Sequence, residues 1–243
     1  MATSSSSHHA DISRVTNLTL DAFRLARSGA GAAAEAIADG SEEALKALRN
    51  CEISLDGIDR DVDEFSTSII TRVSESDARE LLACMKFVVA LERIGDLLLS
   101  FGNRVESVGP RLAAEDKKAL ESMATRLQSM LGEADSAYRE RSLDRAVTVL
   151  RSDAEMDRLR NLIFLHHLET HLEPRRPESF HVLFMAQGLE RAGDHAKNIA
   201  EEVCHLVSGR TVRHVLRSYE MPDEKLFIEH LRAQHREKHR EKQ

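Results

Sequence analysis

A six-residue motif that occurs twice constrains the fold of this chain more than any other feature. Leu-Glu-Arg-Ile-Gly-Asp at 91–96 returns as Leu-Glu-Arg-Ala-Gly-Asp at 189–194, so the two copies start 98 residues apart in a chain of 243. A fixed internal period indicates repeated structural modules. The motif therefore predicts two similar modules of roughly 95–100 residues, each the size of a small domain.

The composition favours helices and a cytoplasmic location. Charged residues make up 31% of the chain and aromatic residues 4%, with no Trp, whereas strands favour aromatic and β-branched residues. No apolar run approaches the ~20 residues that span a membrane, and the start has no secretory signal pattern. The three cysteines lack a CxxC pair, which fits a reducing compartment. The net charge of −7 argues against nucleic acid as the main partner.

Each copy of the motif lies in a long helix with an apolar stripe. The stripe residues recur at spacings of three and four, which is typical of a seam between packed helices. They are Cys84, Phe87, Leu91, Ile94, Leu98, Phe101, Val105 and Val108 in the first half, and Val182, Met185, Leu189, Ala192, Ala196, Ile199, Val203 and Leu206 in the second.

Two further helical runs precede each of these helices, with breaks at 39–41, 73–76, 109–110, 141–142 and 173–177. We predict an all-α fold of two homologous three-helix bundles, at 11–109 and 111–208, in which short connections make successive helices antiparallel neighbours. The Ser-rich start is expected to lack regular structure. A charged C-terminal extension at 209–243 is either a solvated helix that frays or an arm that docks a partner.

The repeated motif carries an acidic pair in each half. Glu92 and Asp96, like Glu190 and Asp194, are four residues apart and share one face of their helix. Their heptad positions beside and behind the apolar seam predict carboxylates that face outward. Like charges at this spacing destabilise an isolated helix by roughly 0.2–0.5 kcal/mol per pair, so the pattern calls for an explanation.

The preceding helices contain acidic pairs of their own. When Val62 is superposed on Met156, the pair Asp59 and Asp63 matches the pair at 153 and 157. Four carboxylates would then share a patch in each half, and a bound cation would relieve their repulsion. Oxygen ligands suit hard ions such as Mg²⁺, Mn²⁺ or Ca²⁺, and carboxylates on helical bundles can also hold iron. A solvated acidic face, neutralised by neighbouring Arg and Lys, remains the alternative.

At these residues the chain resembles the PhoU family of phosphate-uptake regulators. The resemblance rests on the two motifs, on Val62-Asp63-Glu64 and on Thr211-Val212-Arg213-His214. It implies a cytoplasmic adaptor, not an enzyme, made of two three-helix bundles whose E/DxxxD motifs can hold iron, zinc, manganese or magnesium. It also implies partners: the ATPase of a phosphate ABC transporter and a membrane sensor histidine kinase, whose starvation signal the adaptor damps when phosphate is plentiful. Whether the chain forms a homodimer is left open.

The resemblance also implies a set of metal ligands. These are Asp59, Asp63, Glu92 and Asp96 in the first half, and Asp153, Asp157, Glu190, Asp194 and Asn198 in the second. The first half is expected to be the poorer site, because Leu97, Leu98 and Leu99 follow its motif. Two rivals stay open: a helical scaffold that docks basic partner surfaces without metal, and a metal-dependent enzyme.

Overall fold

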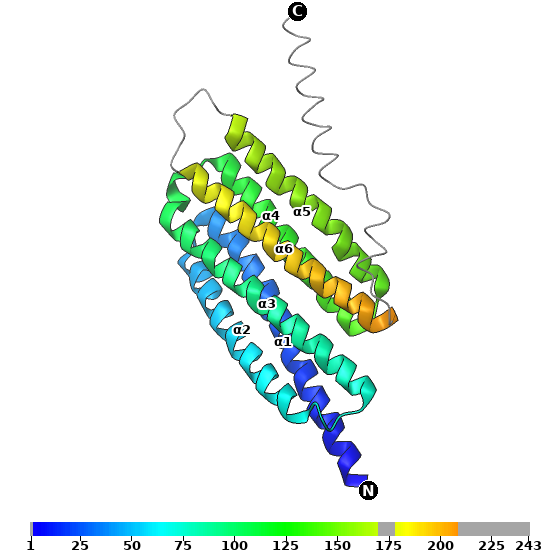
Figure 1. The fold of residues 1–243 in the computed structure, drawn as a ribbon. Helices are drawn as coiled ribbons and strands as arrows, with labels where there is room; N and C mark the ends of the chain where they lie inside the picture. Colours follow the sequence, from blue (N-terminus) through cyan, green and yellow to red (C-terminus); the bar gives the residue numbers. More distant parts are fainter. Residues whose placement is uncertain (1, 170–177, 209–243) are drawn as a thin grey trace, which may run out of the picture. The chain divides into compact units, whose positions relative to one another are not determined.

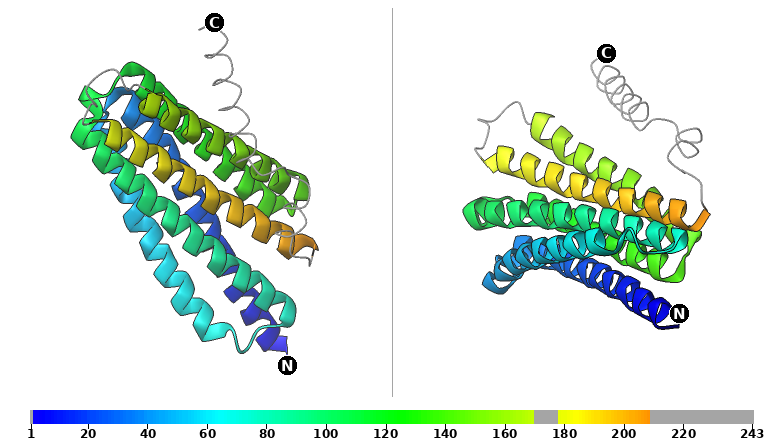
Figure 2. Two further views of the ribbon diagram at one scale, coloured as in Figure 1. Left: turned by 45° about the horizontal axis from the view of Figure 1, so that its top comes forward. Right: turned by 60° about the horizontal axis from the view of Figure 1, so that its bottom comes forward.

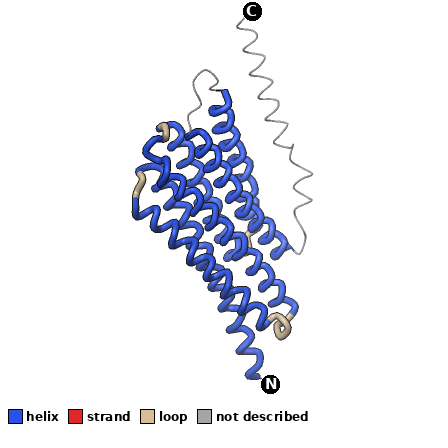
Figure 3. Tube along the Cα trace, turned by 60° about the vertical axis from the view of Figure 1, so that its left-hand side comes forward, coloured by secondary structure: helices blue, strands red, loops and turns tan. Residues whose placement is uncertain are grey.

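The structure is a computed structural model that describes residues 2–169 and 178–208, and in this part it is helical apart from short connections (Figures 1 and 3). The elements are α1 Ala2–Asp39, α2 Glu42–Ile69, α3 Glu75–Val108, the 3-10 turn η1 Gly109–Arg111, α4 Ala114–Glu140, α5 Leu143–Glu169 and α6 Glu178–Ser208. The all-α prediction is confirmed. Helix α1 begins at Ala2, although regular structure was not expected there. The predicted break at 173–177 and the extension at 209–243 lie outside the described residues.

Local chemistry explains where the helices begin and end. Gly40 adopts φ +76° directly after α1, a left-handed conformation that glycine adopts without steric cost. The Oγ of Ser41 then accepts a hydrogen bond from the backbone N–H of Ala44 at 3.2 Å and caps α2. Ser74 caps α3 in the same way, through the N–H of Asp77 at 3.2 Å. Arg141, at φ 54°, ends α4.

The six helices form two bundles that pack side by side within one compact unit. Helices α1, α2 and α3 pack together, as do α4, α5 and α6, and the bundles meet through α1 against α4 and α3 against α6. Figure 2 shows α5 and α6 on one side and α1 and α2 on the other. The Nζ of Lys86 lies 2.9 Å from a carboxylate oxygen of Glu202, while Arg104 stacks on Phe184. Helices α3 and α6 therefore run antiparallel.

The predicted apolar stripes form the core. Leu91 and Ile94 on α3, and Leu189 and Ala192 on α6, are all buried, so each motif is anchored by apolar residues on both sides of its acids. Burial of such side chains stabilises the fold by roughly 1.5–3 kcal/mol for each large one. The position of the acidic residues is therefore fixed by the same helices that build the core.

Candidate functional site

The acids of the second repeat gather where α5 and α6 pack closely. Gly193 makes this approach possible, because a Cβ atom there would lie 3.2 Å from the Cγ of Met156 on α5. Beside this contact, acids of the two helices come together: Asp153 and Asp157 on α5, Glu190 and Asp194 on α6. We call these four residues the second acidic cluster.

Two cations of the chain itself lie within the second acidic cluster. The Nη2 of Arg160 is 3.4 Å from a carboxylate oxygen of Glu190 and 3.8 Å from one of Asp157. The ammonium group of Lys197 on α6 donates a hydrogen bond to Asp153 on α5. The cluster is therefore a network of ion pairs between two helices, and it includes a cation that the metal prediction did not use, Arg160.

Two of these carboxylates are buried. Asp153 is 4% exposed and Glu190 is 8% exposed, so the prediction that the motif acids face outward is wrong for Glu190. The reason is that α6 is surrounded by α3, α4 and α5, which cover more of it than the apolar seam alone. The outward prediction holds for Asp194, which is exposed; Asn198, one turn further on, is also exposed, while Asp157 is half-buried.

Burial changes the acid–base behaviour of both carboxylates. Burial, followed by the nearby charges of Asp194 and Asp157, raises the pKa of Glu190 to about 7, although Arg160 opposes the change. Burial likewise raises the pKa of Asp153 to about 6 against the opposing effect of Lys197. Desolvation of the charged form is the larger effect at both sites.

The first repeat contains a related but differently composed cluster. Gly95 of its motif lies against Leu55 of α2, because a Cβ at Gly95 would be 2.8 Å from Cδ1 of that leucine. Burial, followed by the charges of Asp96, Asp59 and Asp56, raises the pKa of Glu92. Asp56, Asp59, Glu92 and Asp96 are among the carboxylates that act on one another here, and we call these four the first acidic cluster.

Two further acids of α2 bear on the first repeat. Asp63, a predicted ligand, is exposed, and its charge contributes, after burial, to raising the pKa of Asp59. Asp56, which the sequence prediction did not include, belongs to the cluster and pairs with Arg60 at 3.0 Å. The cation at the motif itself is Arg93, which lies 3.4 Å from the carboxylate of its chain neighbour Glu92 and 3.5 Å from that of Asp96.

The two repeats correspond in a register different from the predicted one. In each repeat the glycine of the motif packs on an apolar residue of the preceding helix, and these residues are Leu55 and Met156. The superposition of Val62 on Met156 is therefore wrong by seven residues, two helical turns. The buried pairs of the corrected register are Leu45 with Ala146, Leu48 with Val149, Leu55 with Met156 and Val62 with Ile163.

The corrected register changes which acids correspond. Asp153 and Asp157 now match Glu52 and Asp56, and not Asp59 and Asp63. A sequence signal for this existed: an acid precedes Leu55-Asp56 by three residues, and another precedes Met156-Asp157 by the same distance. The apolar pattern could not reveal it, because a shift by one heptad places apolar residues on apolar residues.

The donors suit a hard cation chemically, but they do not converge on a common point. Carboxylate oxygens are the ligands that Mg²⁺ and Mn²⁺ prefer. Within residues 2–169 and 178–208, however, no group of three or more His, Cys, Asp or Glu side chains is arranged to hold a metal ion. In the second cluster, Arg160 already contacts Asp157 and Glu190, and Lys197 contacts Asp153. Metal binding at the predicted ligands therefore stays a prediction.

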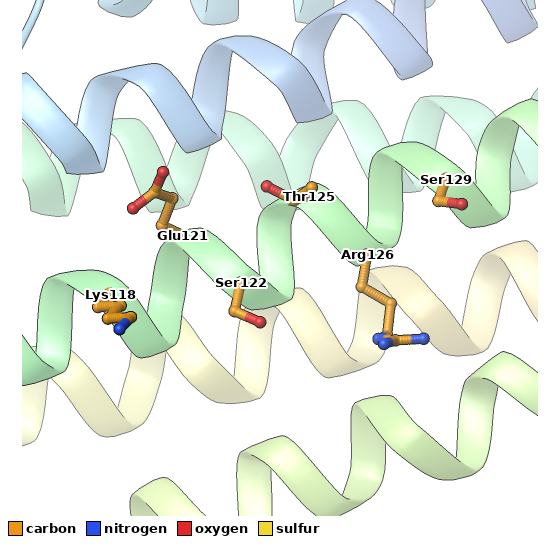
Figure 4. A pocket seen from close by; sticks show the side chains of 6 residues that line it. All are labelled: Lys118, Glu121, Ser122, Thr125, Arg126 and Ser129. Carbon is orange, nitrogen blue, oxygen red and sulfur yellow. The ribbon is translucent and has the colours of Figure 1, made fainter.

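An open polar groove lies elsewhere, along α4. Its lining residues are Lys118, Glu121, Ser122, Thr125, Arg126 and Ser129. Figure 4 shows that Glu121 and Thr125 point to one side of the helix, whereas Ser122 and Arg126 point to the other. Groups that diverge in this way do not assemble a binding or catalytic site.

A membrane-spanning helix is not found among the described residues, because no helix there combines the necessary length with the necessary hydropathy.

Comparison with known proteins agrees with this architecture. The sequence profile of the PhoU domain matches residues 19–105 and 120–203, one match in each repeat. A phosphate-specific transport system accessory protein PhoU homolog of Pseudomonas aeruginosa is 31% identical over 193 residues, which is 75% of this chain and 78% of that protein. A homolog of the same name from Rhizobium meliloti is 31% identical over 64% of this chain and 68% of that protein.

Solved structures share the fold. The crystal structure of PhoU from Pseudomonas aeruginosa superposes with a TM-score of 0.76 at 24% identity, covering 83% of this chain and 99% of that one. The regulatory protein PhoU from Streptococcus pneumoniae gives the same TM-score at 20% identity, with 84% and 99% covered. The doubled motif, the paired bundles and the two profile matches lead to one conclusion: the chain belongs to the PhoU family, whose curated members are accessory proteins of phosphate-specific transport.

Proposed function

We propose that this chain is a cytoplasmic negative regulator of phosphate uptake and of the phosphate-starvation response. The observation that carries the proposal is the acidic cluster beside each copy of the LERxGD motif, on helices that the PhoU domain profile covers. The names of the relatives describe accessory proteins and not enzymes. The partners proposed are the ATPase of the phosphate ABC transporter and the sensor histidine kinase.

The acidic clusters are the proposed docking surfaces. Asp96 and Asp194 are exposed at equivalent places in the two repeats, so each repeat presents a carboxylate beside a packed helix pair. Complementary charge steers association and fixes orientation more than it adds affinity. The ion pairs within the second cluster favour a role in which acidic stripes bind basic partner surfaces without metal. Metal binding, by iron, zinc, manganese or magnesium, remains the alternative proposal for both clusters.

A reporter of the phosphate-starvation response in the native host tests the regulatory function. Deletion of the gene is expected to raise reporter activity in phosphate-rich medium, and the wild-type chain is expected to restore repression. The charge-reversed variant Asp96→Lys/Asp194→Lys should restore it poorly, because it reverses charge on both proposed docking surfaces, at side chains whose exposure is expected to leave the fold intact. Glu121→Lys, which reverses one exposed acid on α4 outside both clusters, is the control. Full repression in the deletion strain would defeat the proposal.

A further inference from the structure

The two acidic clusters differ by a reversal of charge at one position. With Leu55 superposed on Met156, Asp59 of the first repeat stands where Arg160 stands in the second. Glu92 therefore faces another acid across the helix pair, whereas the equivalent Glu190 faces a guanidinium group. The exchange changes the local charge by two units.

At a second position, too, the second repeat has a positive charge that the first repeat lacks. When the two motifs are aligned, Lys197 of α6 corresponds to Leu99 of α3, one turn after the acidic pair. Lys197 donates to Asp153, whose side chain is 6% exposed. The second repeat thus has two cations of its own at positions where the first repeat has an acid and a leucine.

These two cations are held in place. The side chain of Arg160 is 26% exposed and its guanidinium group lies 5.7 Å from the ring centroid of Phe164, in addition to the contacts with Asp157 and Glu190. Lys197 is half-buried between α5 and α6. By contrast, Arg93 at the first cluster is 59% exposed and pairs with residues of its own helix. Part-buried ion pairs are screened by solvent much less than exposed ones.

We propose that Arg160 and Lys197 are the built-in counter-cations of the second acidic cluster and take the place of a metal ion there. Three of its four carboxylates, those of Asp153, Asp157 and Glu190, already contact one of these cations. A divalent ion entering the cluster would meet two positive charges at contact distance from its ligands. The inference concerns only the metal question within the proposed function, and the regulatory role does not depend on it.

Mn²⁺ binding to the full chain, measured by the loss of the free-ion signal in electron paramagnetic resonance, tests the inference. All proteins carry Glu92→Gln/Asp96→Asn, so that the first cluster does not contribute. This parent protein is expected to bind no Mn²⁺ at the second cluster. Adding Arg160→Met/Lys197→Met should create one site, with an apparent Mn²⁺ affinity on the order of tenfold or more above the parent's, because two repelling charges are removed. Adding Asp194→Asn should abolish that new site.

The matched control is Arg158→Met/Lys86→Met, which removes two cations that pair with Glu155 and Glu202 outside the cluster. It should gain no site. Mn²⁺ binding by the parent protein that disappears on Glu190→Gln/Asp194→Asn would overturn the inference, as would a folded Arg160→Met/Lys197→Met variant without a new site. If that variant loses its helical circular dichroism, Mn²⁺ binding by the parent protein decides alone. No binding at the second cluster supports the inference, and binding there overturns it. The reporter assay tests the regulatory function independently.

Discussion

Glu190 shows how a single carboxylate can be buried in a helical bundle. It is 8% exposed, receives a hydrogen bond from the side-chain amide of Gln187 and lies 3.4 Å from Arg160. A buried charge without such partners would cost several kcal/mol. The pKa of about 7 shows that burial and the neighbouring acids outweigh these partners, so the charged form remains disfavoured in the folded protein.

This pKa predicts a pH dependence of stability. Between the ordinary pKa of 4.5 and about 7, the folded state holds a proton on Glu190 that the unfolded state has lost, so stability falls as pH rises through that window. Glu190→Gln should therefore raise the free energy of unfolding by about 1–3 kcal/mol at pH 8 and change it little at pH 4. Urea unfolding at both pH values measures this. An equal effect at both would refute the assigned burial cost.

At this scale the sequence identified the motif residues but not their surroundings. The spacing of Glu190 and Asp194 placed both on one helix face, which the structure bears out. Their burial depends on how many helices surround α6, and no local pattern contains that information. The identity of Asp56 as a member of the first cluster was missed because the apolar pattern of α2 repeats every seven residues.

At the scale of helices, small residues control how closely neighbours approach. A Cβ atom added at Gly29 of α1 would lie 2.7 Å from the Sγ of Cys51 on α2 and 3.2 Å from Cδ1 of Leu98 on α3. Gly57 of α2, by contrast, has open space around the same position. The first glycine is therefore needed for packing, and the second is not.

Two alanine substitutions separate these roles. Gly57→Ala should raise the free energy of unfolding by up to about 1 kcal/mol, because alanine favours the helix. Gly29→Ala should lower it by about 1–3 kcal/mol, because the new methyl group overpacks a buried contact. Thermal unfolding followed by circular dichroism distinguishes the two. Stabilisation by both substitutions would show that α1 can move away from α2 and α3 freely.

Helix ends were the more predictable part of each element. The break at 39–41 follows from Gly40 and Ser41, whose conformation and capping bond the structure shows. The break at 141–142 was also predicted, although Arg141 adopts a left-handed conformation there, which is unfavourable for residues other than glycine. Turn chemistry is local, so the sequence contains it, whereas the register between helices is not local.

At the scale of the whole described unit, an aromatic cluster joins the two repeats. Tyr138 of α4 packs on Phe23 of α1 and Phe87 of α3, with ring centroids 6.2 Å and 5.0 Å away. Its hydroxyl donates a hydrogen bond to Glu80 at 2.6 Å, and Glu80 in turn pairs with Arg141. The repeats therefore share a core and are expected to unfold together.

Tyr138→Ala tests this coupling. The substitution should lower the free energy of unfolding by about 3–5 kcal/mol, because it leaves a large cavity and removes the part-buried hydrogen bond to Glu80. Circular dichroism and tyrosine-independent probes placed in each repeat should still report one transition. Two separate transitions in the wild-type chain would contradict a shared core.

Direct binding to the ATPase subunit of the phosphate transporter is the most decisive test of the account. The purified full chain is titrated with that subunit from the same organism in a calorimeter, at low and high salt and with or without chelator. We expect saturable binding that weakens at high salt, persists with chelator, and is lost in Asp96→Lys/Asp194→Lys but not in Glu121→Lys. Absence of binding, or binding that is indifferent to these charge reversals, would contradict it.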